Sequence, residues 1–148
     1  MKRKAVIFLV SMLQLTIAQS KVPDIKVITA TIQHWISGAP GGRSGTTYTI
    51  KVRILSNRPV IFKNLWIGKE HAAFDVQTFF SDPNKKPAQG DSVLLVYVNL
   101  NQPEKEAKKS KALPMKYKGE ALVEYLVSGK PKYFTIKKFV PLDIFKGQ

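Results

Sequence analysis

Residues Thr47-Tyr48-Thr49-Ile50-Lys51-Val52-Arg53-Ile54 carry the clearest pattern in the chain, a strict alternation of polar and apolar side chains. Successive side chains of a β-strand point to opposite faces, so this alternation predicts a half-buried strand with its apolar residues turned toward a core. The residue types agree, because threonine, tyrosine, valine and isoleucine are enriched in strands. The stretch therefore favours a β-rich fold.

Similar runs occur on both sides of this stretch. Residues 24–34 precede it, and the predicted strands after it are 60–67, 71–80, 93–98, 119–127 and 131–140. The run at 60–67 is apolar on both faces, which predicts a central strand with Trp66 in the core. The weaker pattern at 71–80 is typical of an edge strand. Residues 128–130 predict the turn of a closing hairpin.

About seven short strands predict an all-β fold, an immunoglobulin-like two-sheet sandwich. A small Greek-key barrel is the alternative, because alternation alone does not distinguish the two. Tyr117 stands just before the sixth run, where a tyrosine corner could form. Residues 101–118 are rich in lysine and poor in apolar residues, which predicts a mobile loop. A short helical turn at Glu104–Lys109 is the alternative, disfavoured because it lacks an apolar stripe.

The first 20 residues have the form of a secretory signal peptide, with a basic start at residues 1–4 and an apolar run from Ala5 to Ile17. Small residues suit cleavage after either Ala18 or Ser20. A retained membrane anchor is the alternative, but Gln14 and Thr16 leave the run short of the roughly 20 apolar residues that such an anchor needs. Residues 21–148 then form a single β-sandwich domain, expected in the periplasm or outside the cell.

The composition is strongly basic and lacks cysteine: 24 lysines and arginines stand against 10 acidic residues, for a net charge of +14. Without cysteine there are no disulfides, thiolate metal sites or thiol nucleophiles. The charge favours a protein or an anionic glycan of the envelope as partner. Specific nucleic-acid binding is not predicted, because the lysines are scattered and are not interleaved with aromatic residues that would stack on bases.

A glycine-rich segment separates the first two runs, and its flanks supply the candidate ligand-binding residues His34, Trp35, Arg43, Ser44 and Tyr48. Backbone amides of such a loop, together with an arginine, can face an anionic or sugar group. A nucleotide-binding phosphate loop is not predicted, because Ser37 replaces its first glycine and Arg43 its lysine. The alternative is a purely structural connection held by Trp35 and Tyr48.

No catalytic or metal-binding constellation is apparent. The two histidines, His34 and His71, lie on different runs, so neither a metal nor a cofactor is predicted. Glu120 and Glu124 would lie about 13 Å apart on one strand face, too far for a glycosidase pair, and are interpreted as a solvated face. We therefore expect a non-catalytic binding or adhesion module. The alternative is an envelope hydrolase or accessory enzyme with a site near the glycine-rich segment.

Several short motifs recur in one known group of proteins. They are Gln33-His34-Trp35-Ile36-Ser37-Gly38, Gly45-Thr46-Thr47-Tyr48, Leu65-Trp66-Ile67-Gly68 and Tyr117-Lys118-Gly119-Glu120-Ala121. With these motifs the chain resembles a group of small exported β-sandwich proteins of Bacteroidetes-type bacteria. The resemblance implies export and adds no catalytic residue. Pro40 departs from the simpler glycine and serine loops expected of that group.

Overall fold

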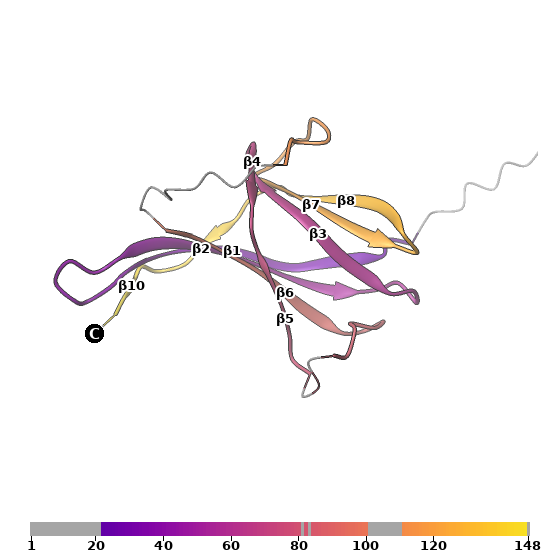
Figure 1. Ribbon diagram of the computed structural model, residues 1–148, viewed down its shortest axis with the longest axis horizontal. Helices are drawn as coiled ribbons and strands as arrows, with labels where there is room; N and C mark the ends of the chain where they lie inside the picture. The colour runs from indigo at the N-terminus through magenta and orange to yellow at the C-terminus, as the bar shows by residue number, and fades with distance from the viewer. Residues whose placement is uncertain (1–21, 81, 83, 101–110, 148) are drawn as a thin grey trace, which may run out of the picture.

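The computed structural model describes residues 22–80, 82, 84–100 and 111–147. Every regular element in these ranges is a β-strand, and the strands form two sheets (Figure 1). The all-β prediction is therefore confirmed for this part of the chain. The predicted signal peptide and residues 101–110, including Glu104–Lys109, lie outside the described residues.

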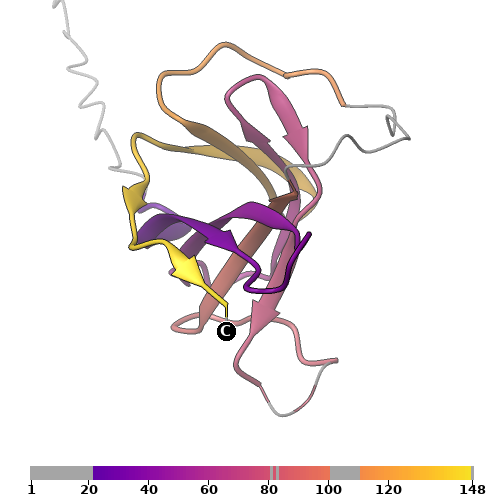
Figure 2. The same ribbon diagram turned by 90° about the vertical axis from the view of Figure 1, so that its left-hand side faces the viewer.

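The first sheet is built around the two longest strands, β1 (Ile25–Ile36) and β2 (Ser44–Ile54). Its path continues antiparallel through β6 (Ser92–Leu100) to β5 (Asp75–Thr78). Two short C-terminal strands, β9 (Val140–Pro141) and β10 (Phe145–Lys146), pair in parallel with the other side of β1 (Figure 2). The sequence did not predict these two strands.

The second sheet has the order β4 (Glu70–Ala72), β3 (Val60–Ile67), β7 (Ala121–Val127) and β8 (Lys130–Ile136). The two sheets do not close into a barrel, so the Greek-key barrel alternative is wrong. The β7–β8 hairpin turns through two residues, Ser128 and Gly129, both with positive φ, as its two-residue loop requires.

The core lies between the two sheets and is formed where the sequence predicts it. Ile50, Val52 and Ile54 on β2 are fully buried, which confirms the strand face predicted from the alternation. The other buried core residues come from both sheets and from the crossing at Phe139: Val60, Leu65, Ala72, Val93, Leu95, Ala121, Val123, Tyr125, Val127, Ile136 and Phe139.

A β-bulge in β1 changes one part of the predicted pattern. The pairing with β2 shifts register between Val27 and Thr29, so β1 contains one extra residue there. Beyond it, the even-numbered side chains of β1 point to the face that the odd-numbered ones occupy before it. Ile25 and Ala30 therefore both pack against the core, although one is odd and the other even in number. In a regular strand Ile28 would share the core face with Ala30, but it is 38% exposed instead.

Two predicted strands have different limits in the structure. The run at 71–80 is not one edge strand: β4 ends the second sheet and β5 ends the first, with the chain crossing between them. The last run ends at Ile136, after which residues 137–139 cross to the first sheet and bury Phe139. A periodic pattern shows which side chains are buried, but not which sheet buries them.

Candidate functional site

The β1–β2 hairpin end extends past the strands of the second sheet and carries the glycine-rich segment at its tip (Figure 1). Antiparallel pairing sets Ile36 opposite Ser44, Trp35 opposite Gly45 and His34 opposite Thr46. The structure thus brings four of the five predicted site residues to this end: His34, Trp35, Arg43 and Ser44.

The fifth residue, Tyr48, lies deeper in the sandwich. Its ring stacks on Tyr97 at 5.7 Å and meets the edge of Phe139 at 5.2 Å, and it packs against the core. Burial, aided by the negative charges of Glu120 and Glu70, raises the pKa of its hydroxyl. Tyr48 therefore supports the base of the hairpin and is not part of its tip.

His34 and Trp35 point to opposite faces of the hairpin, because they are neighbours on one strand. His34 Nδ1 lies 2.9 Å from the hydroxyl oxygen of Thr46 on the face that continues into the core. The Trp35 ring lies across Gly45 on the other face: a Cβ at position 45 would be 2.7 Å from Trp35 Cζ2. A single ligand cannot contact both rings on one flat face.

The tip itself is a compact turn. The backbone N–H of Ser37 donates to the carbonyl of Arg43 at 2.9 Å, and that of Gly42 donates to Ala39 at 2.8 Å. Gly41 has a φ of +72°, which glycine adopts without strain. Two of the amides are thus used inside the turn, which supports a structural role for the glycines. The Arg43 side chain remains exposed.

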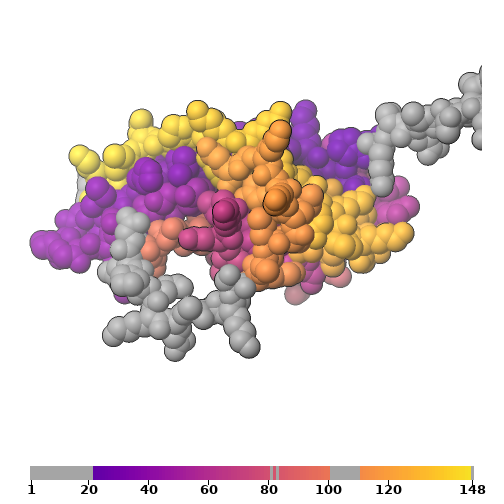
Figure 3. All heavy atoms as spheres, turned by 90° about the horizontal axis from the view of Figure 1, so that it is seen from above, coloured from indigo at the N-terminus to yellow at the C-terminus, as the bar shows by residue number. Residues whose placement is uncertain are grey.

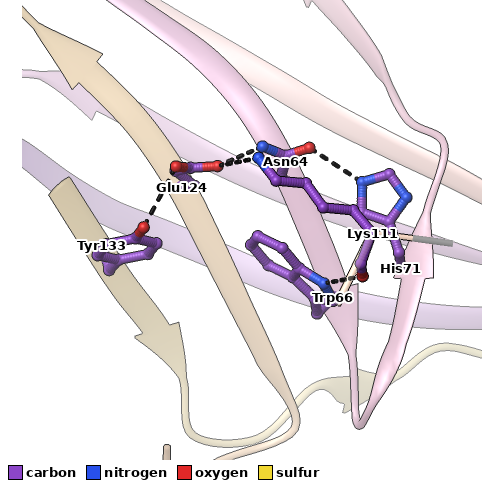
Figure 4. A network of polar contacts seen from close by, with 6 residues as sticks. All are labelled: Asn64, Trp66, His71, Lys111, Glu124 and Tyr133. Carbon is purple, nitrogen blue, oxygen red and sulfur yellow. Dashed lines mark hydrogen bonds and ion pairs between the residues drawn. The ribbon is translucent and has the colours of Figure 1, made fainter. Parts of the chain in front are cut away.

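A second group of polar residues, which the sequence did not indicate, lies on the outer face of the second sheet (Figure 4). Asn64 is its centre: its amide nitrogen donates to Glu124, and its amide oxygen accepts from His71 Nε2 at 3.0 Å. Glu124 also accepts from Tyr133 at 3.2 Å and from Lys111 at 3.4 Å. We call these five residues the Asn64 network.

The Asn64 network keeps Glu124 ionised. Burial, which leaves 12% of its side chain exposed, would by itself raise the pKa of the carboxyl. Hydrogen bonds from Asn64, Lys111 and Tyr133, with the charge of Lys111, outweigh burial and lower the pKa below its usual range. The interpretation of Glu124 as a solvated carboxylate is therefore wrong. Glu120 also has a partner, since it accepts the backbone N–H of Phe139 at 2.7 Å.

Trp66 lies next to the Asn64 network and is completely buried, as predicted. Its side chain points to the outer face of the sheet, whereas that of its neighbour on the strand, Leu65, points into the core. Its indole N–H donates to the backbone carbonyl of Lys111 at 3.1 Å, and its ring meets His71 edge-on at 5.6 Å. Residues 111–118 form the surface over the middle of this side of the molecule (Figure 3).

Tyr117 fastens the same segment. Its hydroxyl donates to the carbonyl of Gly68 in the β3–β4 turn, 49 residues earlier, so it is not a tyrosine corner, which would bond a few residues upstream. The described half of the predicted 101–118 loop is thus attached to the sheet at both of its ends.

Among the described residues, no three histidine or acidic side chains gather closely enough to hold a metal ion. Nor does any helix in that part of the chain have the length and apolar character to cross a membrane. No protein-family model, curated protein or solved structure gives a significant match to the chain.

Proposed function

We propose that this protein is a non-catalytic binding module of the cell envelope or exterior, and that it binds through the β1–β2 hairpin end. The observation that carries the proposal is the exposure of this end. Ile36 is 49% exposed and the neighbouring C-terminal Phe145 is 60% exposed. Exposed apolar side chains grouped with cations mark surfaces that bind partners, and Arg43 and Lys146 are the cations here.

The state of the polar side chains argues against an enzyme. A general acid or base must exchange a proton with a substrate, whereas Glu124 accepts three hydrogen bonds inside the Asn64 network. A site beside the glycine-rich segment would need a concave pocket. Within the described residues, two grooves of about 380 Å³ and 570 Å³ are lined by neither His34 nor Arg43.

The strand order supports an immunoglobulin-like architecture. The sequence β1-β2-β6-β5 in one sheet and β3-β7-β8 in the other corresponds to the A-B-E-D and C-F-G sheets of that fold. Domains of this architecture commonly bind through the loops at one end of the sandwich. In this correspondence the hairpin tip is the A–B loop, at the end of the sandwich opposite the B–C loop.

The partner that the charge favours is an anionic glycan of the envelope. The chain carries a net charge of +14, which attracts polyanions over several ångströms. Trp35 supplies a flat ring against Gly45, two residues along the strand from Arg43, and an aromatic ring together with a cation suits a sugar that carries a carboxylate or sulfate. Specific recognition would then come from Trp35 and attraction from Arg43.

Two matched arginine variants test this proposal. Arg43 and Arg58 are both exposed and lie in the loops at opposite ends of β2. Arg43→Glu is expected to weaken binding to a sulfated or uronic-acid polysaccharide about tenfold, and Arg58→Glu much less. Equal losses would show that only net charge matters. Trp35→Ala is expected to abolish the binding that persists at 0.5 M salt, where the screening length is roughly 4 Å.

Export has its own test. Mass spectrometry of the protein recovered from the periplasm or medium is expected to give a chain starting just after Ala18 or Ser20. A chain that retains Met1 and stays with the membrane would contradict it.

A further inference from the structure

The first half of β1 has a free edge. Residues 25–30 pair with β2 on one side, but β9 joins the other side only at Thr31 and β10 only at Trp35. Within the described residues no strand pairs with this side of residues 25–30. The path of the chain explains the gap, because residues 137–139 are still crossing from the second sheet at that level. A free edge offers backbone N–H and C=O groups to another strand.

A groove of about 570 Å³ runs along this free edge, between β1 and the end of β8. Its apolar walls are Val27, Ile28, Ala30, Ile136 and Val140. Ile28 is 38% exposed and Val140 60% exposed, although both are large aliphatic residues. The β-bulge in β1 turns Ile28 outward at this point. The groove therefore combines unpaired backbone with apolar surface.

The side chains that line the groove carry positive charge, which favours an acidic binding partner. Lys137 and Lys138 line it and are both exposed, and no carboxylate is among its lining residues. A second copy of the chain is disfavoured, because both copies would be strongly basic and would repel each other. An acidic partner is complementary.

We propose that this groove binds an extended acidic segment of a partner protein, which adds as a strand to the free edge of β1. Alternate apolar side chains of the segment contact Ile28 and Val140, and its carboxylates face Lys137 and Lys138. Six residues of edge span about 20 Å, so a strand of about six residues fills it. The β9 strand pairs with the same side of β1 directly beyond this edge, at Thr31 and Ile32. The groove is separate from the hairpin tip, so either proposal can fail without the other.

The first test uses a labelled peptide. The probe is the fluorescein-labelled octapeptide Glu-Asp-Val-Thr-Val-Thr-Val-Glu, titrated with the full chain and followed by fluorescence anisotropy. One control peptide has proline in place of the middle valine, which removes a strand hydrogen bond. The other has lysine in place of the acidic residues. We expect saturable 1:1 binding of the probe, at least about tenfold tighter than either control. Equal binding of the proline peptide would overturn the proposal.

The second test locates the peptide on the protein. Lys137→Glu with Lys138→Glu is expected to weaken binding at least about tenfold. The matched control, Lys116→Glu with Lys118→Glu, makes the same charge change at exposed positions over the other sheet and is expected to weaken binding less than about threefold. Equal weakening by both pairs would overturn the proposal.

A third measurement keeps all the lysines, so it remains informative even if the lysine-to-glutamate variants do not fold. The chain has no cysteine, so Ile28→Cys can carry a single environment-sensitive dye in the groove. Its emission is expected to shift to the blue when the probe peptide binds, while the same dye at Ile61→Cys, an exposed position of the second sheet, does not respond. If sedimentation shows a dimer that excludes the peptide, a second copy fills the groove and the proposal is wrong.

Discussion

The outer faces of the two sheets differ in the side chains they carry and in what lies over them. On β1 and β2 the outer face presents polar residues: Thr29, Thr31, Gln33, Thr47, Thr49 and Lys51. The second sheet presents Trp66 and Leu122, both fully buried, with residues 111–118 attached over Trp66. Removing apolar area from water stabilises the folded state, whereas covering polar side chains stabilises it little. The covering segment, residues 111–118, thus lies over the sheet whose outer face carries the fully buried Trp66 and Leu122.

The largest expected difference in stability is between alanine variants of the two tryptophans, Trp66 and Trp35. Trp66→Ala is expected to lower the free energy of unfolding by about 3 to 5 kcal/mol, because it empties a fully buried site. Trp35→Ala, at the half-buried hairpin end, is expected to cost about 1 kcal/mol or less. Urea denaturation followed by circular dichroism measures both. Equal losses would mean that the two outer faces are not covered differently.

The next effect concerns the glycine below Trp35. A Cβ at position 45 would lie 2.7 Å from the Trp35 ring and 2.8 Å from the carbonyl oxygen of Asn99, so Gly45→Ala is expected to cost about 1 to 3 kcal/mol. In a Trp35→Ala background the cost is expected to fall only in part, because the backbone contact with Asn99 stays. A full recovery in the double variant would show that the ring alone requires glycine here.

The sequence predicted the strands well and their assignment to sheets less well. The alternation around Ile50 and Val52 records burial on one face, and the structure buries both residues completely. Alternation cannot record a crossing between sheets, so the pattern predicts a single strand where the structure has β4 and β5, and it does not predict β9 and β10. The bulge at Ile28 also has no sequence signal, because the extra residue is itself apolar.

The candidate site shows a similar limit. Sequence proximity brought His34 and Arg43 together correctly, because a hairpin joins them. It did not reveal the Asn64 network, whose members are up to 69 positions apart and meet only through strand pairing: Asn64 lies opposite Glu124, and Glu124 opposite Tyr133. The one available signal was the apolar outer face at Trp66, which indicated that something must cover that side of the sheet.

Glu124 provides a test that depends on pH. Its folded pKa lies below the ordinary value of 4.5, so its ionised form stabilises the native state above that pH, and this stabilisation is lost as the pH falls through the folded pKa. Glu124→Gln is expected to cost about 1 to 2 kcal/mol at pH 7. The difference from wild type is expected to narrow below about pH 4.5.

The control for Glu124 is Glu70→Gln, an exposed carboxylate at the edge of the same sheet, expected to change stability by about 0.5 kcal/mol or less. Urea midpoints between pH 3 and 7 measure both variants. A difference for Glu124→Gln that stays constant over this range would show that its hydrogen bonds act without its charge.

The smallest expected loss of stability comes from a variant of Lys111, which distinguishes the backbone contact of residues 111–118 from the side-chain contact of Lys111. Lys111 contributes two contacts: its carbonyl accepts from Trp66, and its ammonium group lies 3.4 Å from Glu124 with 54% of the side chain exposed. Lys111→Ala keeps the carbonyl and removes the exposed ion pair, so it is expected to cost less than about 1 kcal/mol, and less still in 1 M salt. In a Trp35→Phe background, which leaves Trp66 as the single tryptophan, its fluorescence is expected to stay blue-shifted in Lys111→Ala. A red shift in that variant would mean that the ion pair, and not the backbone contact, holds residues 111–118 over the second sheet.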